Sequence, residues 1–129
     1  MRLRIRKGFT LIELLIAMEI VAILATIATP RLQQLKTNAY VAGMRSDLRN
    51  LVTAEEVFFA DSAKYTSTVS QLKYSVTGGG TAPIITTGAG YWTALDTHPN
   101  VPLTQCAIGM NTTNPLVGIA VNEGEPACK

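Results

Sequence analysis

One uninterrupted apolar stretch constrains this chain more than any other feature. Residues 9–29 read FTLIELLIAMEIVAILATIAT, with two carboxylates and no basic residue. As a helix, this stretch would be about 31 Å long, enough to cross the hydrocarbon core of a bilayer. Charged residues make up only 16% of the chain, below the roughly 25% of an ordinary soluble domain. This composition disfavours both a cytosolic globular protein and a disordered chain.

Four basic residues precede the apolar stretch: Arg2, Arg4, Arg6 and Lys7. They predict that the N-terminus is cytoplasmic and that the chain after Pro30 lies on the other side of the membrane. A cleaved secretory signal peptide has the same order of charges and is an alternative. Thr26-Ile27-Ala28 matches a signal-peptidase site poorly, and the stretch contains no glycine. These features favour a retained membrane helix.

The remaining charges and the possible metal ligands exclude further classes of function. After the basic N-terminus the chain carries seven basic and nine acidic residues, so a nucleic-acid-binding surface has no electrostatic support. Cys106, Cys128 and the single histidine, His98, are too few for a structural zinc site. We therefore expect no nucleic-acid partner, no cofactor and no metal.

The sequence also offers no convincing catalytic site, so we do not expect an enzyme. Asp96 lies two residues from His98, but no serine or cysteine stands in a nucleophile turn. His98 belongs to the turn-rich stretch THPNVP and is expected in an exposed loop. Asp96, Asn100, Glu123 and Glu125 could bind calcium only if they converge, and their spacing fits no EF-hand loop.

Both acidic residues of the apolar stretch need an explanation, because an acidic side chain inside a membrane is costly without a partner. Glu13 lies four residues after Phe9, and Glu19 lies near the middle. Both could be protonated or reached by water. Alternatively, cleavage between Gly8 and Phe9 would create an α-amino group near Glu13. Pairing between axially offset helices would then neutralise both charges.

The letters KGFTLIEL at residues 7–14 resemble the prepilin signature of type IV pilins and the related pseudopilins. Gly8, Phe9, Glu13, the apolar helix and Pro30 all fall where that family has them. The resemblance implies cleavage after Gly8 by a prepilin peptidase and N-methylation of Phe9. It also implies that the apolar helix packs into a filament core and that Glu13 assists subunit docking.

The resemblance further implies a location and partners. The precursor would be a single-pass protein of the inner membrane with a cytoplasmic N-terminus. An inner-membrane assembly platform and an assembly ATPase would then add it to a homopolymer, the extracellular pilus on the cell surface. We expect a major pilin. The alternatives are a pseudopilin of a type II secretion system and a monomeric membrane-anchored binding domain.

Helical periodicity resumes after Pro30, which lacks an N–H and predicts a kink or break. Apolar residues recur every three or four positions over residues 31–60, which predicts an amphipathic helix continuous with the first. Its buried stripe is expected to comprise Val41, Met44, Leu48, Leu51 and Phe58, with Glu55 continuing the rhythm. The charged residues expected to face elsewhere are Arg45, Asp47, Arg49 and Glu56.

After residue 71 the pattern changes to short β-forming runs separated by turn residues. Strands are expected at residues 72–76, 83–86, 91–95, 106–110 and 116–121. Their spacing predicts a small antiparallel sheet packed on the preceding helix, which agrees with the α+β head of the pilin family.

In an exported protein, two cysteines favour pairing, and the resemblance implies that Cys106 and Cys128 close a C-terminal disulfide loop. Two buried free thiols are the alternative. The expected fold class is therefore α+β, with a long N-terminal helix packed on an antiparallel sheet. The expected segments are a leader (1–8), a transmembrane and filament-core helix (9–30), an amphipathic helix (31–60) and a β-sheet head (61–129).

Overall fold

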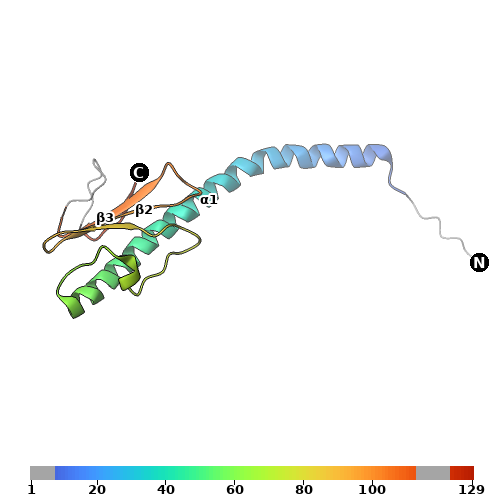
Figure 1. The fold of residues 1–129 in the computed structure, drawn as a ribbon. Coiled ribbons are helices and arrows are strands. Elements are labelled where there is room, and N and C mark those ends of the chain that lie inside the picture. Colours follow the sequence, from blue (N-terminus) through green and yellow to red (C-terminus); the bar gives the residue numbers. More distant parts are fainter. Residues whose placement is uncertain (1–7, 113–122) are drawn as a thin grey trace, which may run out of the picture. The chain divides into compact units, whose positions relative to one another are not determined.

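The computed structural model describes residues 8–112 and 123–129. In chain order, these residues form α1 (Leu11–Ser62), the 3-10 turn η1 (Val69–Gln71), β1 (Ile84–Thr87), β2 (Trp92–Thr97), β3 (Gln105–Met110) and β4 (Ala127–Cys128) (Figure 1). One long helix is followed by a small antiparallel sheet and a C-terminal disulfide. This arrangement confirms the predicted α+β fold class.

The chain divides into two compact units, Met1–Lys36 and Thr37–Lys129. The first unit contains the apolar part of α1. The second, which we call the head unit, contains the rest of α1 and all four strands. Because α1 is continuous across both units, the sequence-based segment boundaries stay predictions.

We expected a kink or a break at Pro30, and helix α1 passes through this residue without a break. The kink stays a prediction. Two hydroxyl groups donate to carbonyl groups one turn earlier: Thr26 to Ala22 at 2.9 Å and Thr29 to Ala25 at 2.7 Å. Such bonds to the preceding turn supply local hydrogen bonding beside a proline that lacks its own donor.

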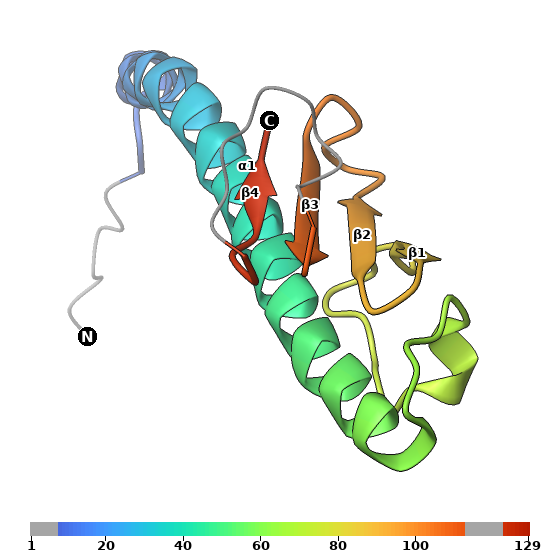
Figure 2. The same cartoon turned by 90° about the vertical axis from the view of Figure 1, so that its left-hand side faces the viewer.

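The four strands of the head unit form an antiparallel meander in the order β1-β2-β3-β4. Figure 2 shows the strands side by side, with the green part of α1 running along one face of the sheet. Strand β2 alternates fully buried and half-buried residues along its length, as a strand with one face on a core must. Three predicted strands, at 83–86, 91–95 and 106–110, are confirmed to within two residues.

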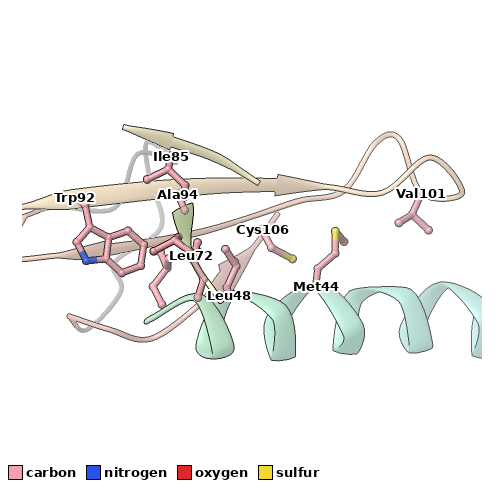
Figure 3. Close-up of a cluster of buried hydrophobic side chains, with 10 residues drawn as sticks. Met44, Leu48, Leu72, Ile85, Trp92, Ala94, Val101 and Cys106 are labelled. Carbon is pink, nitrogen blue, oxygen red and sulfur yellow. The ribbon is translucent and has the colours of Figure 1, made fainter. Parts of the chain in front are cut away.

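The core of the head unit lies between α1 and the sheet. Met44, Leu48 and Leu51 recur at helical spacing on α1, and they meet Trp92 and Ile108 from the strands. Figure 3 shows Met44 and Leu48 extending from the helix towards the strand residues. Leu48, Leu51, Trp92 and Ile108 are all 0% exposed. The predicted stripe is thus confirmed as the contact between helix and sheet.

One charged residue of the helix lies on the buried face, contrary to our expectation from the sequence. We expected Asp47 to face away from the core, but it is 2% exposed. Its Oδ2 accepts the backbone N–H of Thr77 at 2.9 Å, and its Oδ1 accepts the hydroxyl of Thr77. These bonds satisfy the buried carboxylate, which helical periodicity alone classified as a surface group.

The remaining strand predictions need correction. Residues 72–76 form no strand; Leu72 instead fills the core at 7% exposed, and the segment follows the turn η1. The predicted strand at 116–121 lies outside the described residues. Strand β4 (Ala127–Cys128) was not predicted, because two residues carry no detectable alternation. It exists by pairing with Cys106 and Ala107 of β3.

Replacing Leu48 with alanine tests this core. Leu48→Ala is expected to lower the free energy of unfolding of the head unit by about 2–5 kcal/mol, through lost apolar burial and a residual cavity. Urea denaturation of the detergent-solubilised chain, followed by the fluorescence of the buried Trp92, measures this change. Leu103→Ala is the control because Leu103 is 95% exposed. Equal effects of the two substitutions would contradict this core assignment.

Candidate functional site

Helix α1 begins directly after the predicted cleavage junction, and a reciprocal hydrogen-bond pattern defines its first turn. The backbone N–H and the hydroxyl of Thr10 donate to Glu13 Oε2 at 2.8 and 2.7 Å. The N–H of Glu13 in turn reaches the hydroxyl of Thr10 at 3.4 Å. Thr10 therefore caps the helix and Glu13 completes a capping box.

Sequence reasoning assigned Glu13 a role between subunits and missed this role within one subunit. The T-x-x-E spacing of a capping box was visible at residues 10–13. In the described chain, the Glu13 carboxylate is engaged by its own helix start. An amine created at Phe9 would therefore compete with Thr10 for this carboxylate.

Gly8, the residue before the predicted cut, is not required by the fold of this chain. A Cβ added to Gly8 would meet no atom within 4 Å, and Gly8 and Phe9 are both exposed. If only glycine functions at this position, the restriction must come from a partner that approaches the backbone closely.

The apolar part of α1 has no cover from the described chain. It is the only helix among the described residues that is long and apolar enough to cross a membrane, with a mean hydropathy of 2.4 and none of that window buried. Its exposed large apolar residues are Leu11, Ile12, Leu14, Leu15, Ile16, Met18, Ile20, Val21, Ile23, Leu24, Ile27, Leu32 and Leu35, and Phe9 just before the helix is exposed as well. An apolar surface of this size requires lipid or other protein chains as its cover.

The same helix carries a shallow groove on its apolar surface. Ala25, Ala28 and Thr29 line the groove together with Leu32 and Leu35, and small residues of this kind allow a second helix to approach closely.

Glu19 is exposed on this apolar helix. Unlike Glu13, it accepts none of the hydrogen bonds seen among the described residues of the helix. The helix start and its apolar surface together form the candidate assembly site.

At the other end of the chain, the predicted disulfide between Cys106 and Cys128 is confirmed. The two cysteines are directly opposite each other in strands β3 and β4, and Cys106 is 0% exposed. Backbone bonds of 2.9 Å in both directions join Gln105 and Lys129. The Nε of Arg45 lies 3.3 Å from Cys128 Sγ. The end of the chain is therefore tied to the sheet and lies against α1.

His98, which we expected in an exposed loop, is buried at 5% exposed. The residue follows β2 and continues the inward alternation of Trp92, Ala94 and Asp96. Its ring stacks on Tyr40 of α1, with 4.4 Å between the ring centroids. Loop composition did not reveal this, because the burial depends on a helix residue far away in the sequence.

A second buried acid lies beside His98. Asp96 is 1% exposed, and its pKa is raised to about 6, chiefly by burial and then by the negative charge of Asp47. Among the described residues, no group of three or more His, Cys, Asp or Glu side chains could hold a metal ion, so Asp96, Glu123 and Glu125 do not come together. The candidate calcium set thus does not converge within the described part of the chain.

Comparison with known proteins agrees with the geometry of the N-terminal segment. The prokaryotic N-terminal methylation motif matches residues 3–29. The chain is 32% identical over 69 residues to the type IV major pilin protein PilA of Myxococcus xanthus, covering 54% of this chain and 31% of that protein. It is 39% identical over 70 residues to the type IV wide pilus major component PilA4 of Thermus thermophilus, covering 54% of this chain and 53% of that protein.

A third relative is the type IV major fimbrial protein FimA of Dichelobacter nodosus, 40% identical over 60 residues, or 46% of this chain and 38% of that protein. The matched stretches thus span about half or less of the relatives' lengths. The methylation motif lies over the capped, exposed apolar helix, and the α+β fold with its C-terminal disulfide agrees with it. The chain therefore carries the prokaryotic N-terminal methylation motif and is similar to type IV pilins over about half of its length.

Proposed function

We propose that this chain is the major subunit of a type IV pilus. The observation that carries the proposal is the apolar part of α1, none of which is buried by the described chain. Lipid can cover this surface before assembly, and the helices of other copies can cover it afterwards. The relatives are named as major subunits of pili and fimbriae, which supports a structural role rather than an enzymatic one.

Maturation would begin at the junction between Gly8 and Phe9. A prepilin peptidase would cleave this bond, and the new amine of Phe9 would be methylated. Glu13 would then exchange its capping contacts with Thr10 for the Phe9 amine of an adjacent subunit. This exchange would neutralise a carboxylate and an ammonium group in an apolar filament core.

Before assembly the protein would span the inner membrane once, with its N-terminus in the cytoplasm. An assembly platform and an assembly ATPase would extract it into the growing fibre. The apolar helix leaves lipid for an equally apolar protein core, so the hydrophobic effect supplies little driving force. Helix packing, the Glu13 pairing and contacts between head units would have to supply the rest.

Electron microscopy of fibres sheared from cells, combined with mass spectrometry of the chain's N-terminus, tests this proposal. Extracellular fibres built from a chain that starts at a methylated Phe9 would support a pilin. A processed chain restricted to the periplasm and needed for protein secretion would indicate a pseudopilin. An unprocessed chain without fibres would indicate a monomeric anchored domain, and a mature N-terminus at Thr29 would indicate a signal peptide.

Replacing the residue before the cut tests the processing step by itself. Gly8→Val is expected to reduce cleavage by at least about 100-fold, because a β-branched side chain would intrude where the peptidase holds the backbone. The fold of the chain should be unchanged, since the space around Gly8 is open. The ratio of precursor to mature chain on immunoblots measures the effect. Normal cleavage of Gly8→Val would refute the assigned junction.

A further inference from the structure

Two buried carboxylates line one cavity between helix α1 and the sheet of the head unit. Asp47 comes from α1 and Asp96 from β2, and they are 2% and 1% exposed. Asp47 is satisfied by two hydrogen bonds from Thr77. Asp96 differs, because neither of its carboxylate oxygens makes a hydrogen bond of standard geometry with a described residue, and only the backbone N–H of the adjacent Thr97 favours its charged form. A buried carboxylate without partners is costly when ionised.

Two further polar groups near this pair also lack partners. The hydroxyl of Tyr74 is buried without a hydrogen bond to any described residue. Burial, and then the charges of Asp47 and Asp96, raise the pKa of Tyr74, so it stays a neutral donor. His98 accepts the N–H of Asn100 on its Nδ1 at 3.1 Å.

That bond determines the tautomer of the neutral His98 ring, whose proton must then be on Nε2. This Nε2 is buried without a hydrogen-bond partner among the described residues, so it is an unused donor. A nitrogen that carries its proton cannot ligate a metal ion. The His98 tautomer therefore argues against a metal site formed with the two carboxylates.

The cavity has a volume of about 220 Å³ and lies along residues 39–47 of α1. Besides Asp47, Asp96 and His98, it is lined by Ala39, Tyr40, Gly43, Met44, Thr77, Gly78 and Gly80. This lining includes no lysine or arginine that could balance two negative charges. A proton is therefore the simplest charge that can neutralise the pair without a ligand from outside.

We propose that Asp47 and Asp96 form a proton-controlled latch between α1 and the sheet of the head unit. When Asp96 carries a proton, the helix–sheet contact stays closed and the Thr77–Asp47 bonds hold residues 72–81 against α1. When Asp96 loses its proton, two unbalanced charges share the interface and it opens more often. The latch goes beyond the proposed role in a pilus, because it belongs to the head unit whatever that unit assembles into.

The sign of the pH dependence follows from the position of Asp96. Burial, and then the charge of Asp47, raise its pKa from 3.8 to about 6. The backbone N–H of Thr97 acts in the opposite direction and lowers this pKa. A group whose folded-state pKa is raised stabilises the fold fully below its unfolded pKa. This stabilisation is lost as the pH rises through the folded pKa. About two pKa units correspond to at most a roughly 100-fold rise in the opening constant between pH 4 and pH 7.

Other titratable groups near the pair are distinguished by the backbone amides whose hydrogen exchange they affect. His98 also lines this cavity, and its Nδ1 accepts the N–H of Asn100, so the exchange of the Asn100 amide reports His98 separately. Burial also raises the pKa of Glu55, further along α1. Its Oε2 accepts the N–H of Thr66 at 3.1 Å, so the exchange of the Thr66 amide reports Glu55 separately.

The test uses the full-length chain in detergent micelles. Carboxyl-carbon NMR should show Asp96 titrating near pH 6. Hydrogen-exchange protection factors of the Thr77 and β2 amides should fall by up to about 100-fold between pH 4 and pH 7. In Asp96→Asn these protection factors should be independent of pH, while the change at Thr66 persists. Asp61→Asn, which alters an exposed carboxylate near the end of α1, should behave as the wild type.

Asp47→Asn should move the Asp96 midpoint to lower pH, because it removes one of the charges that raise it. Titration of wild-type Asp96 near pH 4 would overturn the latch, even if no variant folds. An unchanged pH dependence in Asp96→Asn would overturn it as well. So would calcium ions that abolish the pH dependence at millimolar concentration, because the pair would then be a metal site.

Discussion

Glu13→Gln is expected to lower the yield of surface fibres by roughly 100-fold or more, while membrane insertion and cleavage after Gly8 continue. Glutamine retains a side-chain oxygen that can accept the Thr10 N–H, so the helix cap survives. The substitution removes only the charge that would pair with the Phe9 amine of the next subunit. An ammonium group left unpaired in an apolar core is strongly unfavourable.

The matched variants separate the cap from the charge. Thr10→Val removes the capping hydroxyl but retains the carboxylate, and a moderate defect in assembly is expected. Glu13→Ala removes both functions and should be no better than Glu13→Gln. Glu19→Gln is the control for neutralising an acid elsewhere in the apolar helix, with a milder defect expected. Immunoblots of sheared fibres, normalised to mature chain in the membrane, measure all four.

Two outcomes would contradict the assignment of Glu13. If Glu13→Gln assembles normally and Thr10→Val does not, then Glu13 serves the helix start and not the neighbouring subunit. If Glu19→Gln abolishes fibres while both Glu13 variants assemble, then the docking carboxylate is Glu19. Either pattern would leave the processing step, tested at Gly8, unaffected.

Loss of the disulfide should have the second large effect. Cys128→Ser is expected to lower the free energy of unfolding of the head unit by about 3 kcal/mol, because the bond closes a loop between residues 22 positions apart. This is a large fraction of the net stability of a small domain. Urea denaturation followed by Trp92 fluorescence measures it. Cys128 is the better site for serine, because Cys106 is fully buried.

Reduction of the wild-type chain should reproduce the effect of Cys128→Ser. Thiol alkylation of the exported protein should modify no cysteine before reduction and two cysteines after it. Fibre yield should fall together with stability, while cleavage after Gly8 remains normal. Alkylation of both cysteines without reductant would show that the exported protein carries free thiols and would remove the basis for this prediction.

The N-terminal part of this chain could be predicted well from the sequence. The helix was predicted from local composition, and the resemblance to pilins from the spacing of Gly8, Phe9 and Glu13. Neither prediction needs a contact from a distant residue. The apolar stripe of α1 and three strands of the sheet were also predictable. Their periodicities follow directly from the geometry of helices and strands.

The sequence by itself therefore determined the apolar helix and the helix-plus-sheet class of the head. Only the tertiary structure decided the burial of Asp47, Asp96 and His98, and the existence of strand β4. The physical reason is the same in each case. A polar side chain becomes a core residue, and two residues become a strand, only when distant partners supply hydrogen bonds, ring contacts or a disulfide.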